Sequence, residues 1–141
     1  MKSPLISLPT DNNQLSTATV WQTAKFYLKL GYFNQALTLA YSLSQKDISQ
    51  QKNYQQFYTE AIKLGAEFAE EIEDFQRAVY YWEQLAKQNS QDADIWYGLG
   101  IAKANLQDYP GSTNALNRCL QLKPDHPKAR SRLMEIQSLI R

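Results

Sequence analysis

The residues that most often build catalytic and metal sites are scarce in this sequence. Its 141 residues include one cysteine, Cys119, and one histidine, His126. A lone cysteine cannot form an internal disulfide, which argues against a disulfide-stabilised secreted domain and fits a reducing compartment. Without a second histidine or cysteine, a zinc site of the usual composition cannot be assembled. We therefore predict no metal, no cofactor and no enzyme activity, with Cys119 a buried inert thiol and His126 in a turn between helices.

Long apolar runs and an excess of one charge are also missing. No segment approaches the roughly 20 apolar residues of a membrane span, and the first residues, interrupted by Pro4 and Pro9, lack the apolar run of a signal peptide. The 15 basic and 14 acidic residues give a net charge of +1. Such a balance does not favour nucleic acid or an anionic membrane as a partner. We expect a soluble cytoplasmic protein that binds no nucleic acid and does not insert into a membrane.

The charges are nevertheless unevenly placed along the chain. Residues 1–65 hold 6 basic and 3 acidic residues, residues 66–117 hold 3 and 9, and residues 118–141 hold 6 and 2. Within the acidic part, Glu67, Glu70 and Glu71 would share one face of a helix. A basic peptide could be attracted to this face, and a solvated face near a helix end is the alternative.

Helical periodicity is what the sequence has in abundance. Apolar residues recur at three- and four-residue spacings, whereas no segment alternates with period two for long enough to form a strand. The spacing predicts helices over about residues 14–30, 33–44, 50–72 and 75–86, two more between 93 and 124, and a last one from 127. A polar loop is predicted over 44–49. Gly31 suits a left-handed C-cap, and Asp74 and Asp108 suit N-caps.

A repeated pattern joins these helices into pairs. The second helix of each pair places a small residue three positions after an aromatic one, at Phe33 and Ala36, Phe75 and Ala78, and Tyr109 and Ser112. The interval from Ala78 to Ser112 is 34 residues, and a helix–turn–helix unit of that length resembles the tetratricopeptide repeat (TPR). The last pair matches the TPR pattern at Trp96, Leu99, Gly100, Ser112, Leu116 and Pro124 and departs from it at Lys103, where tyrosine is usual.

The resemblance implies an all-α fold, a right-handed α-solenoid of about three antiparallel helix pairs plus a C-terminal capping helix. In this arrangement residues 1–12 form a flexible N-terminal segment, 13–126 the repeat domain and 127–141 the capping helix. Trp82 and Trp96 are expected to fill the space between successive pairs. The interval from Ala36 to Ala78 is 42 residues, eight more than one period, so we expect the excess in the 44–49 loop or in a lengthened third helix.

TPR proteins line a concave groove with the first helix of each pair, and the resemblance implies a groove at the same positions here. These positions hold Trp21, Lys25, Lys29, Lys63, Glu67, Glu70, Tyr97, Ile101 and Asn105. A shift of one residue in the weakly matching first pair would place Trp21 in the core instead, so both locations stay open. Tyr97 is expected on the groove surface, where its replacement would change stability by less than about 1 kcal/mol.

The function implied by the resemblance is that of a non-enzymatic adaptor or assembly factor holding a partner protein segment in this groove. The alternative is a structural subunit that docks through its convex face or through an aromatic patch at Tyr54, Phe57 and Tyr58, or that self-associates as a homodimer. Chaperone-binding TPR proteins grip a C-terminal carboxylate with lysine, asparagine and arginine. Those positions hold Trp21, Lys25, Leu64, Asp94 and Gly98 here, which argues against such a clamp.

Overall fold

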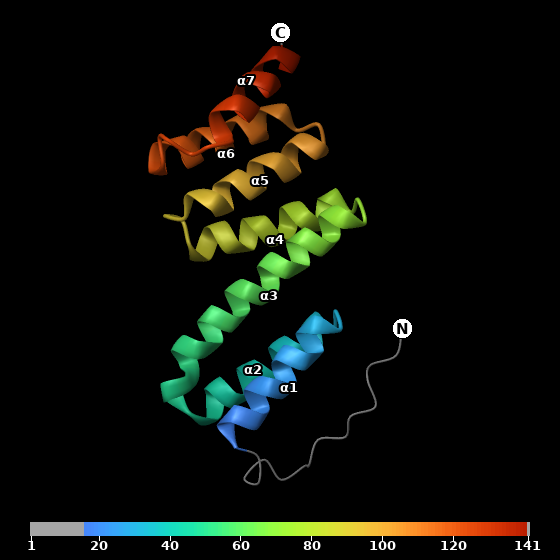
Figure 1. The fold of residues 1–141 in the computed structure, drawn as a ribbon, viewed down its shortest axis with the longest axis vertical. Coiled ribbons are helices and arrows are strands. Elements are labelled where there is room, and N and C mark those ends of the chain that lie inside the picture. The colour runs from blue at the N-terminus through green and yellow to red at the C-terminus, as the bar shows by residue number, and fades with distance from the viewer. Residues whose placement is uncertain (1–15, 141) are drawn as a thin grey trace. The chain divides into compact units, whose positions relative to one another are not determined.

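The structure, a computed structural model, describes residues 16–140, and every regular element in that range is a helix (Figure 1). The elements are α1 (Thr17–Lys29), α2 (Phe33–Lys46), the short 3-10 helix η2 (Ile48–Gln50), α3 (Gln51–Glu71), α4 (Phe75–Gln88), α5 (Ala93–Asn105), α6 (Tyr109–Leu122) and α7 (Ala129–Ile140). The predicted all-α class is confirmed. The segment expected to be flexible, 1–12, lies outside the described residues. Within residues 16–140, no helix is long and apolar enough to cross a membrane.

Two helix boundaries differ from the prediction for identifiable reasons. The predicted polar loop at 44–49 is wrong at its start, because Ser44 is buried within α2 and its hydroxyl donates to the Tyr41 carbonyl. The excess residues lie near the expected places, in η2, which Asp47 caps by accepting from the Ser49 N–H, and in the lengthened third helix, the 21-residue α3. At the other end of the chain, α7 begins at Ala129 rather than at 127.

The chain divides into two compact units, residues 1–61 and 62–141, with the boundary inside α3. In the first unit, α1, α2 and the first half of α3 enclose a core of Ala24, Tyr27, Leu28, Ala36, Ala40, Phe57 and Ala61. The small alanines let the three helices approach closely. Phe57 belongs to this core at 4% exposure, so the prediction of a surface patch at Tyr54, Phe57 and Tyr58 is wrong for its central member.

In the second unit, the missing side chains of two glycines allow α5 to pack tightly. A Cβ atom at Gly98 would lie 2.7 Å from the Trp82 ring of α4, and one at Gly100 would lie 2.8 Å from Leu116 of α6. The buried Ser112 hydroxyl donates to the Gly100 carbonyl at 2.7 Å, so α5 and α6 are joined by a hydrogen bond as well as by packing.

The same turn joins the two helices of each pair. Its central residue has positive φ at Gly31 (84°), Glu73 (61°) and Gln107 (64°). The residue that follows donates its N–H to the carbonyl five positions earlier, from Tyr32 to Tyr27, from Asp74 to Ala69 and from Asp108 to Lys103. This is the Schellman helix ending. The predicted caps at Asp74 and Asp108 are confirmed, since each carboxylate accepts from the N–H three residues later.

Because two of these left-handed positions carry side chains, they offer a simple test of the turn. A non-glycine residue is destabilised by about 1–2 kcal/mol in left-handed backbone. Glycine avoids this cost, but it loses more conformational entropy on folding, which offsets part of the gain. We expect Gln107→Gly to raise the free energy of unfolding by about 0.5–1 kcal/mol, measured by urea denaturation. Gly31→Gln should lower it by a similar amount. Destabilisation by Gln107→Gly would contradict this assignment of the turn.

Candidate functional site

The residues predicted to line a groove fall mainly into two surface hollows, one in each unit. The His126 hollow, in the second unit, is lined by Lys63, Glu67, Glu70, Trp82, Asp94, Tyr97, Gly98, Ile101, Lys123, His126, Pro127 and Lys128. The Trp21 hollow, in the first unit, is lined by Trp21, Lys25, Asn53, Gln56, Phe57 and Glu60. Lys29 and Asn105 are exposed and line neither hollow. Partner binding at these positions stays a prediction.

Trp82 forms the floor of the His126 hollow. Its ring lies against the backbone of α5 at Gly98 and is only 6% exposed. The indole Nε1–H donates to Glu70 Oε1 at 2.9 Å, which ties α4 to the last turns of α3. The sequence prediction placed Glu70 on the groove surface, and the structure shows that this carboxylate also holds the floor in place.

The Glu70 carboxyl is electrostatically unusual. Partial burial raises its pKa above the ordinary glutamate value, the Trp82 hydrogen bond lowers it by less, and the nearby charge of Glu67 raises it further. Folding therefore disfavours the ionised form of Glu70 relative to the unfolded chain. Its contribution to stability is fully present below the unfolded pKa, about 4.3, and is lost as the pH rises through the folded pKa.

Glu70→Gln tests this direction, because the glutamine oxygen can still accept from Trp82 while the charge is removed. We expect the variant to be more stable than the wild type at pH 7, by about 0.5 kcal/mol after allowing for solvent screening. The difference should vanish near pH 3, where the wild-type carboxyl is also neutral. Thermal unfolding at the two pH values measures it. A variant that is less stable at pH 7 would show that the charged hydrogen bond outweighs the desolvation cost.

His126 closes the end of the hollow nearest α7. Its Nδ1 accepts from the backbone N–H groups of Lys128 and Ala129 at 3.3 and 3.2 Å, so the imidazole satisfies two backbone donors at the start of α7. Since Nδ1 is an acceptor, the proton is assigned to Nε2, which donates to Asp94 Oδ1 at 2.9 Å. The prediction of a turn histidine is confirmed, and the ring is buried within that turn at 7% exposure.

Tyr97 contributes to packing as well as to the surface of the hollow. Its ring stacks on His126, with centroids 4.8 Å apart and planes 25° apart. The Arg132 guanidinium on α7 also donates to the Tyr97 oxygen, and this interaction is the main cause of the raised pKa of Arg132. The small effect of replacing Tyr97 on stability stays a prediction, and these contacts show that its side chain also joins α5 to His126 and α7.

The sequence left open whether Trp21 lies in the core or on the surface, and the structure shows that its side chain contacts the core and also lines the Trp21 hollow. The side chain is half-buried, and its ring centroid lies 5.6 Å from that of the core residue Phe57. Its Nε1–H donates to Gln50 Oε1 at 2.9 Å, and this hydrogen bond joins α1 to η2. Trp21 thus packs on the core of the first unit with one side and lines the hollow beside Lys25 with another.

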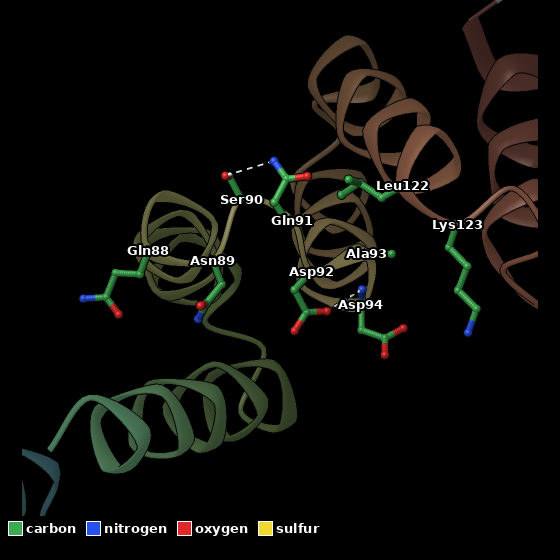
Figure 2. Close-up of a pocket in the computed structure, with 9 residues that line it drawn as sticks. All are labelled: Gln88, Asn89, Ser90, Gln91, Asp92, Ala93, Asp94, Leu122 and Lys123. Atoms are coloured by element: carbon green, nitrogen blue, oxygen red, sulfur yellow. Dashed lines mark hydrogen bonds between the residues drawn. The ribbon is translucent and has the colours of Figure 1, made fainter. Parts of the chain in front are cut away.

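A third hollow lies next to the loop between α4 and α5, and the acidic side chains that line it are bonded within the fold. Figure 2 shows the carboxylates of Asp92 and Asp94 directed to the same side as the Lys123 side chain. Asp92 accepts from the Asp94 N–H at 3.0 Å and caps α5, and Asp94 accepts from His126. Both acids thus have partners within the fold. Within residues 16–140, no three His, Cys, Asp or Glu side chains are grouped to hold a metal ion.

Cys119 lies in the core between α6 and α7, fully shielded from solvent. Burial, and then the charge of Asp94, raise the pKa of its thiol. A thiol that resists ionisation is a poor nucleophile. The prediction of a buried inert cysteine agrees with this environment.

The chain matches no protein-family model and no curated protein, but it is similar to solved structures. One is the first TPR of Spaghetti (RPAP3) bound to the HSP90 peptide SRMEEVD, at 17% identity and a TM-score of 0.58 over 87% of this chain and 91% of that one. Another is MamA from Desulfovibrio magneticus RS-1, at 17% identity and a TM-score of 0.58 over 89% and 67% of the two chains. A third is a C-terminal TPR-containing domain from Plasmodium falciparum, at 13% identity and a TM-score of 0.59 over 86% and 85%. At these identities the similarity concerns the fold alone.

Proposed function

We propose that this TPR-like helical repeat protein is a non-enzymatic adaptor or assembly factor that holds a segment of a partner protein. The observation that carries the proposal is the His126 hollow, which spans about 540 Å³ and combines half-buried apolar side chains, Tyr97 and Ile101, with exposed charges. Apolar anchors of this kind supply most of the affinity for a bound peptide, and the charged rim supplies register. The peptide-bound TPR of similar fold supports this function.

The partner segment should differ from one held by a carboxylate clamp. Of the positions that form the clamp in chaperone-binding proteins, Gly98 faces the Trp82 ring and Asp94 carries a negative charge beside His126. Neither can grip a terminal carboxylate. The hollow is lined by acids, among them the exposed Glu67, and by Lys63, Lys123 and Lys128. We therefore expect a bound segment with charges of both signs, and binding should be weaker at 0.5 M than at 0.1 M salt.

Glu67→Lys and Ile101→Asp test this proposal by capture of partners from the native lysate. Glu67 is exposed, so we expect its replacement to change stability by less than about 1 kcal/mol. Ile101 is half-buried, so its replacement should cost more, and the folded fraction of this variant is checked by thermal unfolding before binding is compared. Each variant should weaken binding roughly tenfold or more, which corresponds to about 1.4 kcal/mol. Glu83→Lys is the matched control, because it makes the same charge change on an exposed position of α4. A partner retained by all three variants would contradict groove binding.

The alternative function, a structural subunit that docks outside the groove or self-associates, is favoured by one observation. Met134, Leu139 and Ile140 of α7 are 66%, 60% and 52% exposed. Light scattering of the wild type and of Met134→Lys distinguishes the two functions. A dimer that dissociates in the variant would support self-association through α7, and a monomer in both samples would support the adaptor.

A further inference from the structure

The part of α3 that belongs to the second unit carries a row of exposed apolar side chains. Leu64, Phe68 and Ile72 follow one another at intervals of four residues and are 46%, 52% and 55% exposed. This spacing places them on one face of the helix, and we call them the α3 row. A single exposed apolar side chain is common in soluble proteins, but several in line are typical of an interaction surface.

The corresponding row of α5 is covered by another helix. The turns after α3 and α5 share one geometry, with left-handed residues 34 positions apart, so Leu64 corresponds to Gly98 and Phe68 to Ala102. Gly98 packs against the Trp82 ring of α4, and Ala102 is fully buried. In helical repeat proteins the neighbouring repeat buries such faces. The α3 row is therefore a repeat-packing face that stays half-exposed.

The two flanks of the α3 row differ in chemistry. Glu67 and Glu71 are exposed on one flank, each three residues after a member of the row. On the other flank α4 lies close, because a Cβ atom at Gly65 would lie 3.2 Å from the Tyr81 ring. A ligand on the row thus meets carboxylates on one side and an aromatic residue on the other.

We propose that the α3 row binds an amphipathic helix of a partner protein, with apolar side chains at i, i+4 and i+7 and with lysine or arginine along one edge. Apolar side chains at this spacing pack along a row of the same kind. The basic edge faces Glu67 and Glu71, which gives the complex its charge complementarity. The bound helix packs on α3 as α4 packs on α5, a mode of packing that the chain already contains.

This surface is distinct from the groove proposed above. Of the residues that form the row and its acidic flank, only Glu67 also lines the His126 hollow. The chain therefore has room for a peptide segment in the hollow and for a helix on the α3 row. Binding on the row does not depend on a ligand in the hollow, so the two proposals stand or fall separately.

Fluorescence anisotropy with the full chain and a labelled synthetic peptide tests the proposal. The peptide has about 16 residues, enough to form a helix on binding, with leucines at i, i+4, i+7 and i+11 and lysines along one edge. A control peptide has glutamate in place of every lysine. We expect the lysine peptide to bind about tenfold more tightly, or better, than the glutamate peptide.

Variants of the chain locate the contact. Ile72→Asp and Glu71→Lys should each weaken binding of the lysine peptide by about tenfold or more. Ile48→Asp and Glu83→Lys make the same changes at exposed positions outside the row and should leave binding unchanged. All four side chains are exposed, so the variants should fold, and thermal unfolding confirms that they do.

Amide chemical shifts measured by nuclear magnetic resonance complete the test. We expect the lysine peptide to change the signals of the α3 row most strongly. Larger changes at Tyr97 and Ile101 would place the peptide in the His126 hollow and overturn the proposal. Equal binding of the two peptides, or no binding of either, would also overturn it. Signals of the row that shift when the chain is concentrated without peptide would identify a second copy as the occupant, against this proposal.

Discussion

Trp82→Ala should lower the free energy of unfolding by about 3–5 kcal/mol, the usual cost of removing a buried aromatic side chain. The indole fills the space created by the missing side chain of Gly98 and donates to Glu70 at 2.9 Å. Its removal leaves a cavity between α4 and α5 and takes away the partner of a partly buried carboxylate. For a domain whose total stability is about 5–15 kcal/mol, the loss should appear as a large fall in melting temperature.

Trp96→Ala is the matched comparison for this prediction. Trp96 is half-buried, and its Nε1–H donates to the Ser90 carbonyl at the loop between α4 and α5. The same substitution should therefore cost clearly less than it does at Trp82. Equal costs at the two positions would contradict the assignment of Trp82 as the main tryptophan of the second unit.

His126→Ala should release α7 from the rest of the second unit. The imidazole accepts from the Ala129 N–H through Nδ1, stacks on Tyr97 and donates to Asp94. Removing the side-chain acceptor of the first N–H groups of α7 should cost about as much as the loss of an N-cap, up to about 2 kcal/mol, and the lost packing adds to it. Hydrogen exchange of the amides in 129–140 should accelerate well beyond that of the amides in α5, because α7 opens while the other helices stay packed.

Asp94→Asn is the control for the His126 prediction. Asparagine keeps a side-chain oxygen that can accept from Nε2, so we expect α7 to remain protected from exchange in this variant. The Asp94 side chain is 70% exposed, and its charge should contribute little to stability. If His126→Ala leaves the exchange of α7 unchanged, the Leu133 and Ile136 packing alone holds the helix.

Sequence patterns predicted the helix pairs because the signals involved are local. Ala36, Ala78 and Ser112 are all fully buried, each three positions after the aromatic residue that begins α2, α4 or α6. The caps at Asp74 and Asp108 form bonds to an N–H three residues away. Contacts within one turn depend on residue type and spacing, so they can be inferred without knowledge of the remaining fold.

Partner binding at the predicted groove positions stays a prediction, but the structure shows which of these residues lie together and which have a second role. Lys63, Glu67, Glu70, Tyr97 and Ile101 do line one hollow. Periodicity did not show that Glu70 and Tyr97 also hold other helices in place. Periodicity also did not show that the Trp82 ring packs against Gly98, although a glycine in the interior of a helix is a signal of close packing.

What the sequence by itself determined is the helical class, the pairing of helices, their turns and most of their caps, since these follow from hydrophobic period and local hydrogen bonding. The tertiary structure alone decided what His126 and Trp82 do. The His126–Asp94 bond joins residues 32 positions apart, and the Trp82–Glu70 bond joins two helices across a turn. Contacts of this kind depend on how whole helices are rotated and packed against one another, which residue spacing within a single helix does not specify.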